Sequence, residues 1–251
     1  MKNILIVGDS WGVPNYAKGY DTLPEHHTEY RLRDLGYNVF NYSLNGGSNT
    51  DTINYAVSAI ENKKPRPEED TSGKRKTHAD PAIGPEKIPE PNYRGEKIDW
   101  IVWFHTESIR SAIYPVLFRW IRLEDIHELG SKTSYRAFKY LVEICGNPKT
   151  VVIGGQAPVD PMLYDYHKPT HVIEDWRSEI VGRKLPKCIS LSRLDIVERS
   201  NHSTDEKLEI MNIHSQIYDA MSNKEQFFDR CHPAAMSHKQ LTNRLHTWFS
   251  Q

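Results

Sequence analysis

Short apolar runs of strand type alternate with helical segments along almost the whole 251-residue chain. Because strands joined by helical crossovers pair in parallel, this alternation favours a sheet covered by helices on both faces. The sequence therefore predicts a single domain over 1–251, built as a three-layer α/β/α sandwich with a mostly parallel five-stranded sheet. The strand-like runs are 3–8, 37–44, 98–104, 150–153 and 188–191, and the helical segments are 25–35, about 51–62, 131–145, 204–221 and 233–249.

The most suggestive residue, Ser10, comes directly after the first of these runs. Four consecutive apolar residues, 4–7, indicate a strand buried on both faces, which stops at Gly8. Ser10 follows just past the carboxyl end of that strand, where ligands bind in open α/β sheets. A serine there can act as a nucleophile and place its own N–H beside the group that it attacks. The alternative is that Asp9 and Ser10 only cap a following helix.

Local signals set several expected boundaries. A loop over 12–24 is long enough to line a cleft, Gly36 ends the helix 25–35, and Thr50 or Asp51 caps the next helix. Residues 156–186 are expected to be irregular because they contain four prolines. The run Ser203-Thr204-Asp205-Glu206 predicts a capping box, and Pro233 is expected at the start of the last helix.

Two segments interrupt the pattern. Residues 63–97 contain six prolines and sixteen charged residues, so they are expected to be an insertion without a core of its own. Residues 109–130 are rich in large apolar and aromatic side chains and are expected to mix short helix with loop. An oligomer or assembly contact through 63–97 or 109–121 is one open use for these segments.

Composition excludes several classes of function. The net charge of −1 does not indicate a nucleic-acid partner, and no apolar run is long enough for a membrane span. Three widely spaced cysteines form neither a disulfide framework nor a zinc ribbon. The histidines lack metal-ligand spacing and there is no phosphate-binding glycine loop, so we expect no metal and no cofactor. The start of the chain lacks the pattern of a signal peptide, which leads to the expectation of a cytoplasmic protein.

A second stretch with catalytic potential lies near the end of the chain. Asp229 stands three residues before His232, and Pro233 follows. In a turn, such an aspartate can accept the Nδ1 hydrogen of the histidine and leave Nε2 free to take a proton. A surface turn with an Asp cap is the alternative for this pattern.

Taken together, these motifs resemble those of the SGNH (GDSL-like) hydrolases. The resembling blocks are Gly8-Asp9-Ser10-Trp11-Gly12, Asn45-Gly46-Gly47-Ser48 and Asp229 to His232, in the family's order. The resemblance implies a flavodoxin-like SGNH fold and a triad of Ser10, His232 and Asp229. It also implies an oxyanion hole made by the N–H groups of Ser10 and Gly47. The Gly-Asp-Ser-Trp-Gly start is also similar to that of SGNH-like proteins of tailed bacteriophages.

The third block of that family departs from its pattern here. Where members carry Gly-x-Asn-Asp, this chain has Phe104-His105-Thr106-Glu107-Ser108, with Glu107 nearest the asparagine position. An ionised carboxylate cannot donate a hydrogen bond to an oxyanion. Either Thr106 or His105 replaces the lost donor, or Glu107 is protonated or turned away, or turnover is slow. Asp9, Trp11, His105 and Glu107 are the residues expected to contact substrate.

Two functions follow from these residues. The first is a serine hydrolase that cleaves an ester, such as an O-acyl or acetyl ester of a carbohydrate or another small acyl ester. The second is an SGNH-fold protein with little or no catalysis that serves as a binding or structural component, for example of a phage particle, where it would be virion-associated. The first would act on a small acyl-ester or glycan substrate, and the second is favoured by the altered third block.

Overall fold

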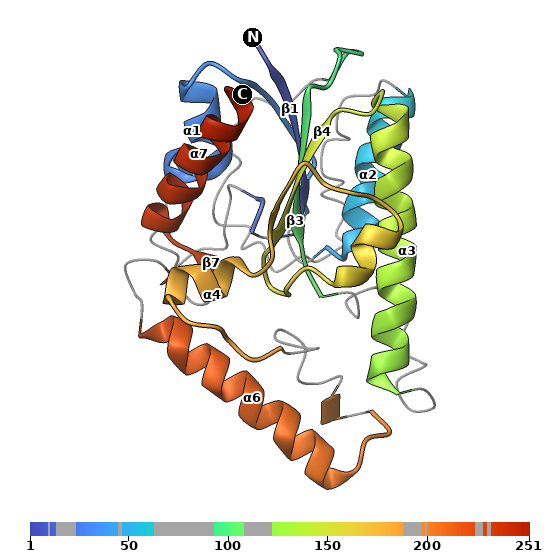
Figure 1. Cartoon of the computed structure of the whole chain (residues 1–251), viewed down its shortest axis with the longest axis vertical. Coiled ribbons are helices and arrows are strands. Elements are labelled where there is room, and N and C mark those ends of the chain that lie inside the picture. Colours follow the sequence, from blue (N-terminus) through green and yellow to red (C-terminus); the bar gives the residue numbers. More distant parts are fainter. Residues whose placement is uncertain are drawn as a thin grey trace, which may run out of the picture.

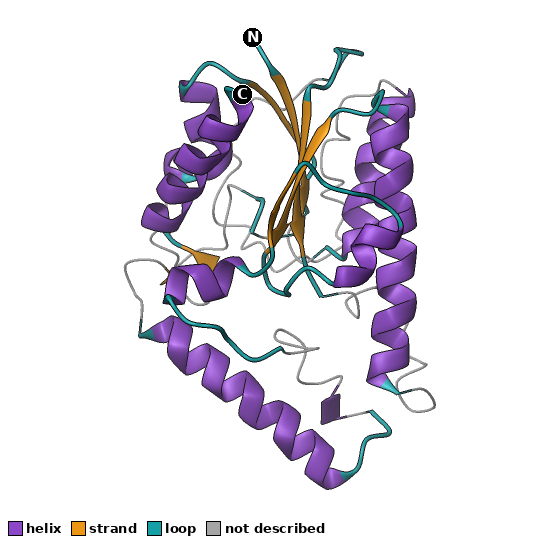
Figure 2. Cartoon of the chain, viewed as in Figure 1, coloured by secondary structure: helices purple, strands orange, loops and turns teal. Residues whose placement is uncertain are grey.

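Five parallel strands form the centre of the molecule, in the order β2-β1-β3-β4-β5 (Figures 1 and 2). The computed structural model describes residues 1–9, 11–13, 24–44, 47–62, 93–107, 122–187, 197–198, 200–223, 228–229 and 232–251. The strands are β1 (Asn3–Gly8), β2 (Asn38–Asn41), β3 (Trp100–His105), β4 (Lys149–Gly154) and β5 (His171–Ile173). This order reverses direction between β1 and β3, which is where open α/β sheets form a binding crevice.

Both faces of the sheet are buried, which explains the uninterrupted apolar runs in its central strands. Ile4 and Ile6 of β1 belong to one hydrophobic core, whereas Leu5 and Val7 belong to the other. Successive side chains of a strand point to opposite faces, so each central strand feeds both cores.

Helices form the two outer layers (Figure 1). On one face lie α1 (Thr28–Asp34), α4 (Trp176–Val181) and α7 (Ala235–Phe249), and on the other lie α2 (Asn49–Asn62) and α3 (Leu123–Ile144). The 3-10 helices η1 (Pro24–His26) and η4 (Pro161–Asp165), the helix α6 (Thr204–Ser222) and the antiparallel pair β6 (Phe228–Asp229) and β7 (His232–Pro233) complete the described elements. The predicted three-layer architecture with a parallel five-stranded sheet is confirmed.

The fifth strand is not the one that the sequence predicted. It is formed by His171–Ile173, inside the stretch expected to be irregular, and it pairs with Val151–Ile153 of β4. Three residues between a proline-containing loop and a helix give too little periodicity to be recognised. The predicted strand 188–191 lies outside the described residues.

The third helix begins eight residues before the earlier of its two predicted starts, Ser131 and Thr133. Gly130 and Ser131, the latter a predicted start of the helix, lie buried in its middle. The Ser134 hydroxyl donates to the Gly130 carbonyl (2.7 Å) and lies 3.1 Å from the Thr50 hydroxyl of α2. Small residues here therefore let two helices pack closely, and they do not mark a break.

Other boundaries moved by a few residues. The predicted helix 25–35 is divided into η1 and α1, with His27 as the cap of α1, and Gly36 follows its end at φ +85°. The cap of α2 is Ser48, and not Thr50 or Asp51 as predicted. The Ser48 hydroxyl accepts the N–H of Asp51 (3.1 Å). The capping box of Ser203 and Glu206 is confirmed. The last helix begins at Ala235, two residues after the predicted start, Pro233.

The end of the insertion contributes to the core, contrary to its composition. Tyr93 is buried and its ring packs edge-on against Phe40, with centroids 5.5 Å apart. The carbonyl of Lys97 accepts a hydrogen bond from the side chain of Asn3 (2.7 Å). Residues 63–92, the rest of the insertion, and 109–121 lie outside the described residues, as does most of the loop 12–24.

Within the described part of the chain, no helix is both long and apolar enough to cross a membrane.

Candidate active site

The turn after β1 is formed by a glycine that ends the strand and by an aspartate that follows it. Gly8 has φ +151°, and a Cβ there would lie 2.6 Å from the Cβ of Phe104, so only glycine fits. The Asp9 carboxylate accepts the N–H of Trp11 (3.0 Å), and the Asp9 carbonyl accepts the N–H of Gly12 (2.9 Å). Asp9 is therefore a turn-forming residue. Ser10, which this turn encloses, lies outside the described residues.

The far side of the turn is anchored by two side chains from other elements. The Trp11 carbonyl lies 3.2 Å from Nε2 of His27, and the Gly12 carbonyl accepts a hydrogen bond from the Asn41 amide (2.6 Å). A Cβ on Gly12 would lie 2.3 Å from the Ser43 hydroxyl, so a side chain at this position would push the turn away from β2.

Asp9 and Trp11, both expected to contact substrate, are fully buried. The Trp11 ring packs edge-on against Trp176 of α4, with centroids 5.6 Å apart. These two residues hold the turn in place from beneath.

The second block forms a tight turn before α2. The N–H of Gly47, the predicted oxyanion donor, donates to the Leu44 carbonyl (3.0 Å). A Cβ on Gly47 would lie 2.8 Å from a methyl of Thr52, which requires a glycine here. Asn45 and Gly46 lie outside the described residues.

The third block is clamped to the second by one asparagine. The side chain of Asn49 donates to the Thr106 carbonyl (2.7 Å) and accepts the Thr106 N–H (2.9 Å). This pair of bonds fixes the start of α2 against the end of β3. The backbone N–H of Thr106, a predicted oxyanion residue, is therefore already donated within the chain.

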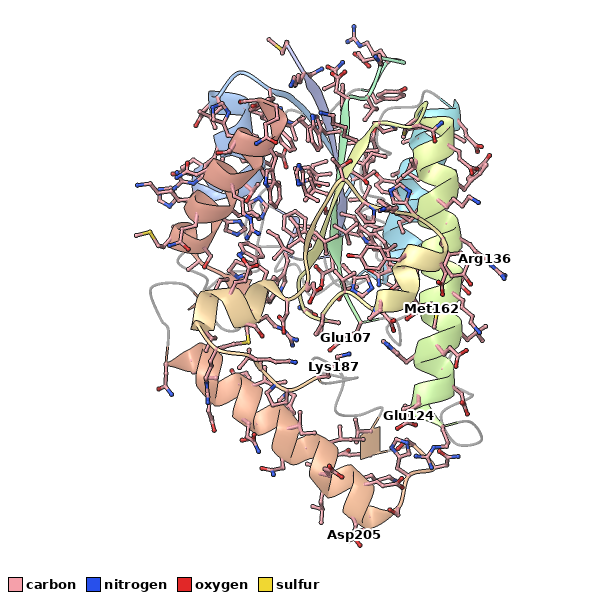
Figure 3. The ribbon with its side chains drawn as sticks, in the orientation of Figure 1. Glu107, Glu124, Arg136, Met162, Lys187 and Asp205 are labelled. Atoms are coloured by element: carbon pink, nitrogen blue, oxygen red, sulfur yellow. The ribbon has the colours of Figure 1, made fainter. Side chains whose placement is uncertain are left out.

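His105 is the last residue of β3, and its side chain packs against α3. It is fully buried, and its Nε2 is 3.3 Å from the Tyr135 hydroxyl. Burial, together with the nearby His127, lowers its pKa to about 4, so the ring is neutral near pH 7. The same burial raises the pKa of Tyr135. Glu107 is also fully buried, at the carboxyl end of β3 (Figure 3).

The predicted turn between Asp229 and His232 exists as a two-stranded hairpin. Asp229 of β6 is paired with His232 of β7 in the antiparallel register, and Phe228 is paired with Pro233. Only two residues, 230 and 231, join the strands, so the backbone of Asp229 lies opposite that of His232. The His232 side chain is partly exposed; the Asp229 side chain lies outside the described part of the structure.

Two buried histidines connect the turn after β1 with this hairpin. The rings of His27 and His238 have centroids 4.1 Å apart. His27 contacts the Trp11 carbonyl, and the Pro233 backbone lies close enough to the His238 ring to influence its pKa. The chain neighbours of Ser10 and His232 therefore meet at one pair of rings. Ser10 itself, the first of the two predicted catalytic residues, lies outside the described residues.

Sequence reasoning missed the residues that hold the site together. His27 and His238 are 211 positions apart, so no local pattern relates them, and Asn41 and Asn49 looked like ordinary strand and helix-start residues. Asn41 follows two apolar residues at the end of β2 and is buried, so its amide needs partners within the chain. Among the described residues, no three His, Cys, Asp or Glu side chains are grouped so as to hold a metal ion.

A polar cavity lies beyond the carboxyl edge of the sheet. Because α3 runs antiparallel to the strands and is longer than they are, its first turn extends past that edge (Figures 1 and 3). The cavity between this turn and α6 has a volume of about 240 Å³. Two isoleucines line it, Ile210 and Ile213, together with the ionisable residues Glu124, Lys187, His202, Glu206 and Glu209. Two of these carboxylates already have partners within the chain, because Glu124 contacts His202 and Glu206 accepts hydrogen bonds from Ser203 and Arg122.

Comparison with known proteins gives structural similarities only. No protein-family model matches the chain, and no curated protein matches it in sequence. One similar solved structure is a carbohydrate esterase whose active site is described as having divergent catalytic and non-catalytic binding functions. It has a TM-score of 0.46 and 10% identity, over 100% of this chain and 68% of the other.

A second similar structure is a lipase/acylhydrolase from Enterococcus faecalis, with a TM-score of 0.38 and 13% identity over 97% of this chain and 92% of the other. Neither is described as a bacteriophage protein, so the phage-type resemblance gains no support. At this similarity, the two structures assign no activity to the chain, whose own topology is that of an α/β/α sandwich with a 2-1-3-4-5 parallel sheet.

Proposed function

We propose that this protein is a serine hydrolase that cleaves a small acyl ester, with Ser10 as nucleophile, His232 as general base and Asp229 as its orienting carboxylate. The observation that carries the proposal is the meeting of Trp11 and Pro233 at the His27–His238 pair. These two residues directly follow Ser10 and His232 in sequence, so the two end motifs converge from opposite ends of the chain.

The chemistry follows the roles of a Ser-His-Asp triad. The Ser10 hydroxyl attacks the acyl carbon while His232 takes its proton, and the alcohol leaves with that proton from His232. Water then attacks the acyl-serine in the same way and releases the acid. Asp229 stays ionised and keeps the His232 ring in the tautomer whose Nε2 faces Ser10.

Stabilisation of the oxyanion is the demanding step. In the proposed mechanism the N–H of Ser10 is the first donor. The Gly47 N–H serves as the second when it is shared between the Leu44 carbonyl and the oxyanion, and the Thr106 hydroxyl is the third. Each such donor contributes about 10²–10³ in rate, so partial use of these donors gives a slow enzyme.

For the substrate class we propose a small acyl ester, such as the O-acyl or acetyl ester of a carbohydrate that the resemblance of the motifs implies.

The test is ester hydrolysis by the purified protein. Acetylated sugars and p-nitrophenyl esters of increasing acyl length are compared for the natural protein and the variants Ser10→Ala, His232→Ala and Asp229→Asn. We expect turnover that is highest with acetylated sugars and lost in Ser10→Ala and His232→Ala, and a large fall in kcat for Asp229→Asn, about 10²–10⁴. Ser250→Ala and His246→Ala, both on the exposed surface of the last helix, are the matched controls. Equal rates in Ser10→Ala and the natural protein would refute the proposal.

A second candidate function is glycan binding without turnover. It is favoured by the engagement of the Gly47 and Thr106 N–H groups with chain partners, and by Glu107 in place of an oxyanion donor. In that case acetylated sugars would bind to the natural protein and to Ser10→Ala alike, and no acid would be released.

A further inference from the structure

The buried pair His27 and His238 belongs to two different outer helices. His27 is the cap residue of α1, and His238 lies in the first turns of α7. Both side chains are fully buried, and the His238 ring also packs edge-on against Trp176, with centroids 5.8 Å apart. Buried histidines need partners for both ring nitrogens, and these partners define what the pair does.

The partners of His27 fix where its proton lies. Its Nδ1 accepts the N–H of Glu29 (3.4 Å), which closes the first turn of α1. In a neutral ring the proton is therefore on Nε2, and that N–H donates to the Trp11 carbonyl (3.2 Å). One side of the ring thus caps a helix while the other holds the residue that follows Ser10.

His238 holds the other motif in a similar way. Its Nδ1 lies 3.0 Å from the hydroxyl of Thr28, and the Pro233 backbone lies close enough to the ring to influence its pKa. Since Thr28 follows His27 in the chain, residues 27 and 28 contact both Trp11 and His238. Three side chains therefore form a continuous connection between Trp11 and Pro233.

Burial keeps the rings of His27 and His238 in the neutral state. Desolvation lowers the pKa of His27 to about 3, against the opposing effect of the bond to Trp11. It lowers the pKa of His238 well below 6.5, and the neighbouring His27 lowers it further. Both rings are thus neutral near pH 7, and each offers one donor and one acceptor.

We propose that His27, Thr28 and His238 are positioning residues that set the separation between the turn carrying Ser10 and the hairpin carrying His232. This inference rests on the proposed function, since its catalytic consequence requires these two residues to react together. A shift of about 1 Å between a nucleophile and its base costs on the order of 10² in rate. A rigid neutral pair, packed between both backbones, prevents such a shift.

Two substitutions of His27 separate its tasks. The amide oxygen of His27→Asn can replace Nδ1 as the cap of α1, but the shorter side chain does not reach Trp11. The longer side chain of His27→Gln places an N–H near the position of Nε2 and loses the cap. We expect His27→Asn to lower kcat about tenfold to a hundredfold with little change in KM. His27→Gln should keep kcat within a few-fold of the natural protein and show a lower Tm.

Hydrogen exchange supplies a readout that needs no activity. In His27→Asn we expect faster amide exchange in residues 9–12 and also in 228–233, although His27 touches only the first of these segments. Protection unchanged in 228–233, or kcat reduced as much by His27→Gln as by His27→Asn, would overturn the positioning role. Absence of Ser10-dependent turnover in the natural protein would instead refute the proposed function, and the exchange data would still decide whether the pair couples the two segments.

Discussion

Four of the five residues from Gly8 to Gly12 have a described structural task. Gly8 and Gly12 avoid close contacts with Phe104 and Ser43, Asp9 folds the turn, and Trp11 packs beneath it. The neighbours of Ser10 on both sides are thus fixed by packing and hydrogen bonds. The glycines of this motif could be predicted from the sequence, whereas the burial of Asp9 could not, because its partner is a backbone N–H.

Glu107 provides a test at the level of one side chain. A buried carboxylate near a developing oxyanion opposes the charge of the transition state. We expect Glu107→Asn to raise ester turnover, by up to about 10²-fold, because it supplies a neutral donor. Steady-state kinetics beside Glu107→Gln are the measurement. A lower rate in both variants would show that the carboxylate has a positive task, such as gripping a substrate hydroxyl.

The buried histidines also predict how stability depends on pH. In the unfolded chain, His27 and His238 bind protons as the pH falls below about 6.5, whereas the folded pKa of His27 is about 3 and that of His238 is well below 6.5. The free energy of unfolding should therefore be largest above pH 6.5 and fall on acidification, by up to about 1.4 kcal/mol per pH unit for each ring.

Urea unfolding at several pH values between 7.5 and about 4.5 checks this slope. Carboxylates also contribute to it, so the informative quantity is the difference between the natural protein and His27→Asn. In His27→Asn, the pH dependence of the free energy of unfolding should lack the contribution of the His27 ring. An identical slope in the two proteins would contradict a neutral buried His27.

At the scale of elements, the start of α2 is fixed by two neighbouring residues with different tasks. Ser48 caps the helix, while Asn49 clamps it to Thr106 of the adjoining loop with two hydrogen bonds. Asn49→Ala removes both hydrogen bonds to the buried backbone of Thr106 and should lower the free energy of unfolding by about 2–4 kcal/mol. Ser48→Ala, the matched cap variant, should cost about 1 kcal/mol. Equal losses, measured by denaturant unfolding, would mean that the clamp adds nothing.

The elements differ in how far the sequence reveals them. The strands β1, β3 and β4 could be predicted because burial on both faces makes their apolar runs continuous. The short β5 could not, because its three residues give too little periodicity. Just after its pairing with β4, a Cβ on Gly154 would lie 2.0 Å from the Glu174 carbonyl oxygen. The start of α3 was missed because Gly130 and Ser131 serve helix packing. Such tertiary contacts override local propensity.

At the scale of the whole molecule, the last residues of the insertion 63–97 pack on the core, although the composition of the insertion did not indicate this. Its last residues hold Tyr93 against Phe40, whereas 63–92 carry most of its prolines and charges. We expect replacement of 63–92 by a Gly/Ser linker of about ten residues to change Tm by less than about 3 °C, because few apolar side chains are lost. Thermal unfolding measures this. A Tm decrease of 10 °C or more would show that the segment packs on the domain, whereas Tyr93→Ala should be destabilising in either background.

The residues of the candidate site could be proposed from the sequence, but the contacts that connect them could not. Ser10, Asp229 and His232 were proposed from two short motifs at opposite ends of the chain. The architecture brings their neighbours Trp11 and Pro233 to one buried pair of rings. The residues that make this connection lie on α1 and α7, and only the folded chain relates them.

The central claim, that Ser10 is an activated nucleophile, is tested most directly by covalent labelling. The natural protein and Ser10→Ala are treated with a fluorophosphonate, and their intact masses and labelled peptides are compared, with Ser250→Ala as control. We expect one added phosphonyl group on the peptide that contains Ser10, at a rate that falls sharply in His232→Ala. An unlabelled natural protein, or equal labelling of Ser10→Ala, would contradict it.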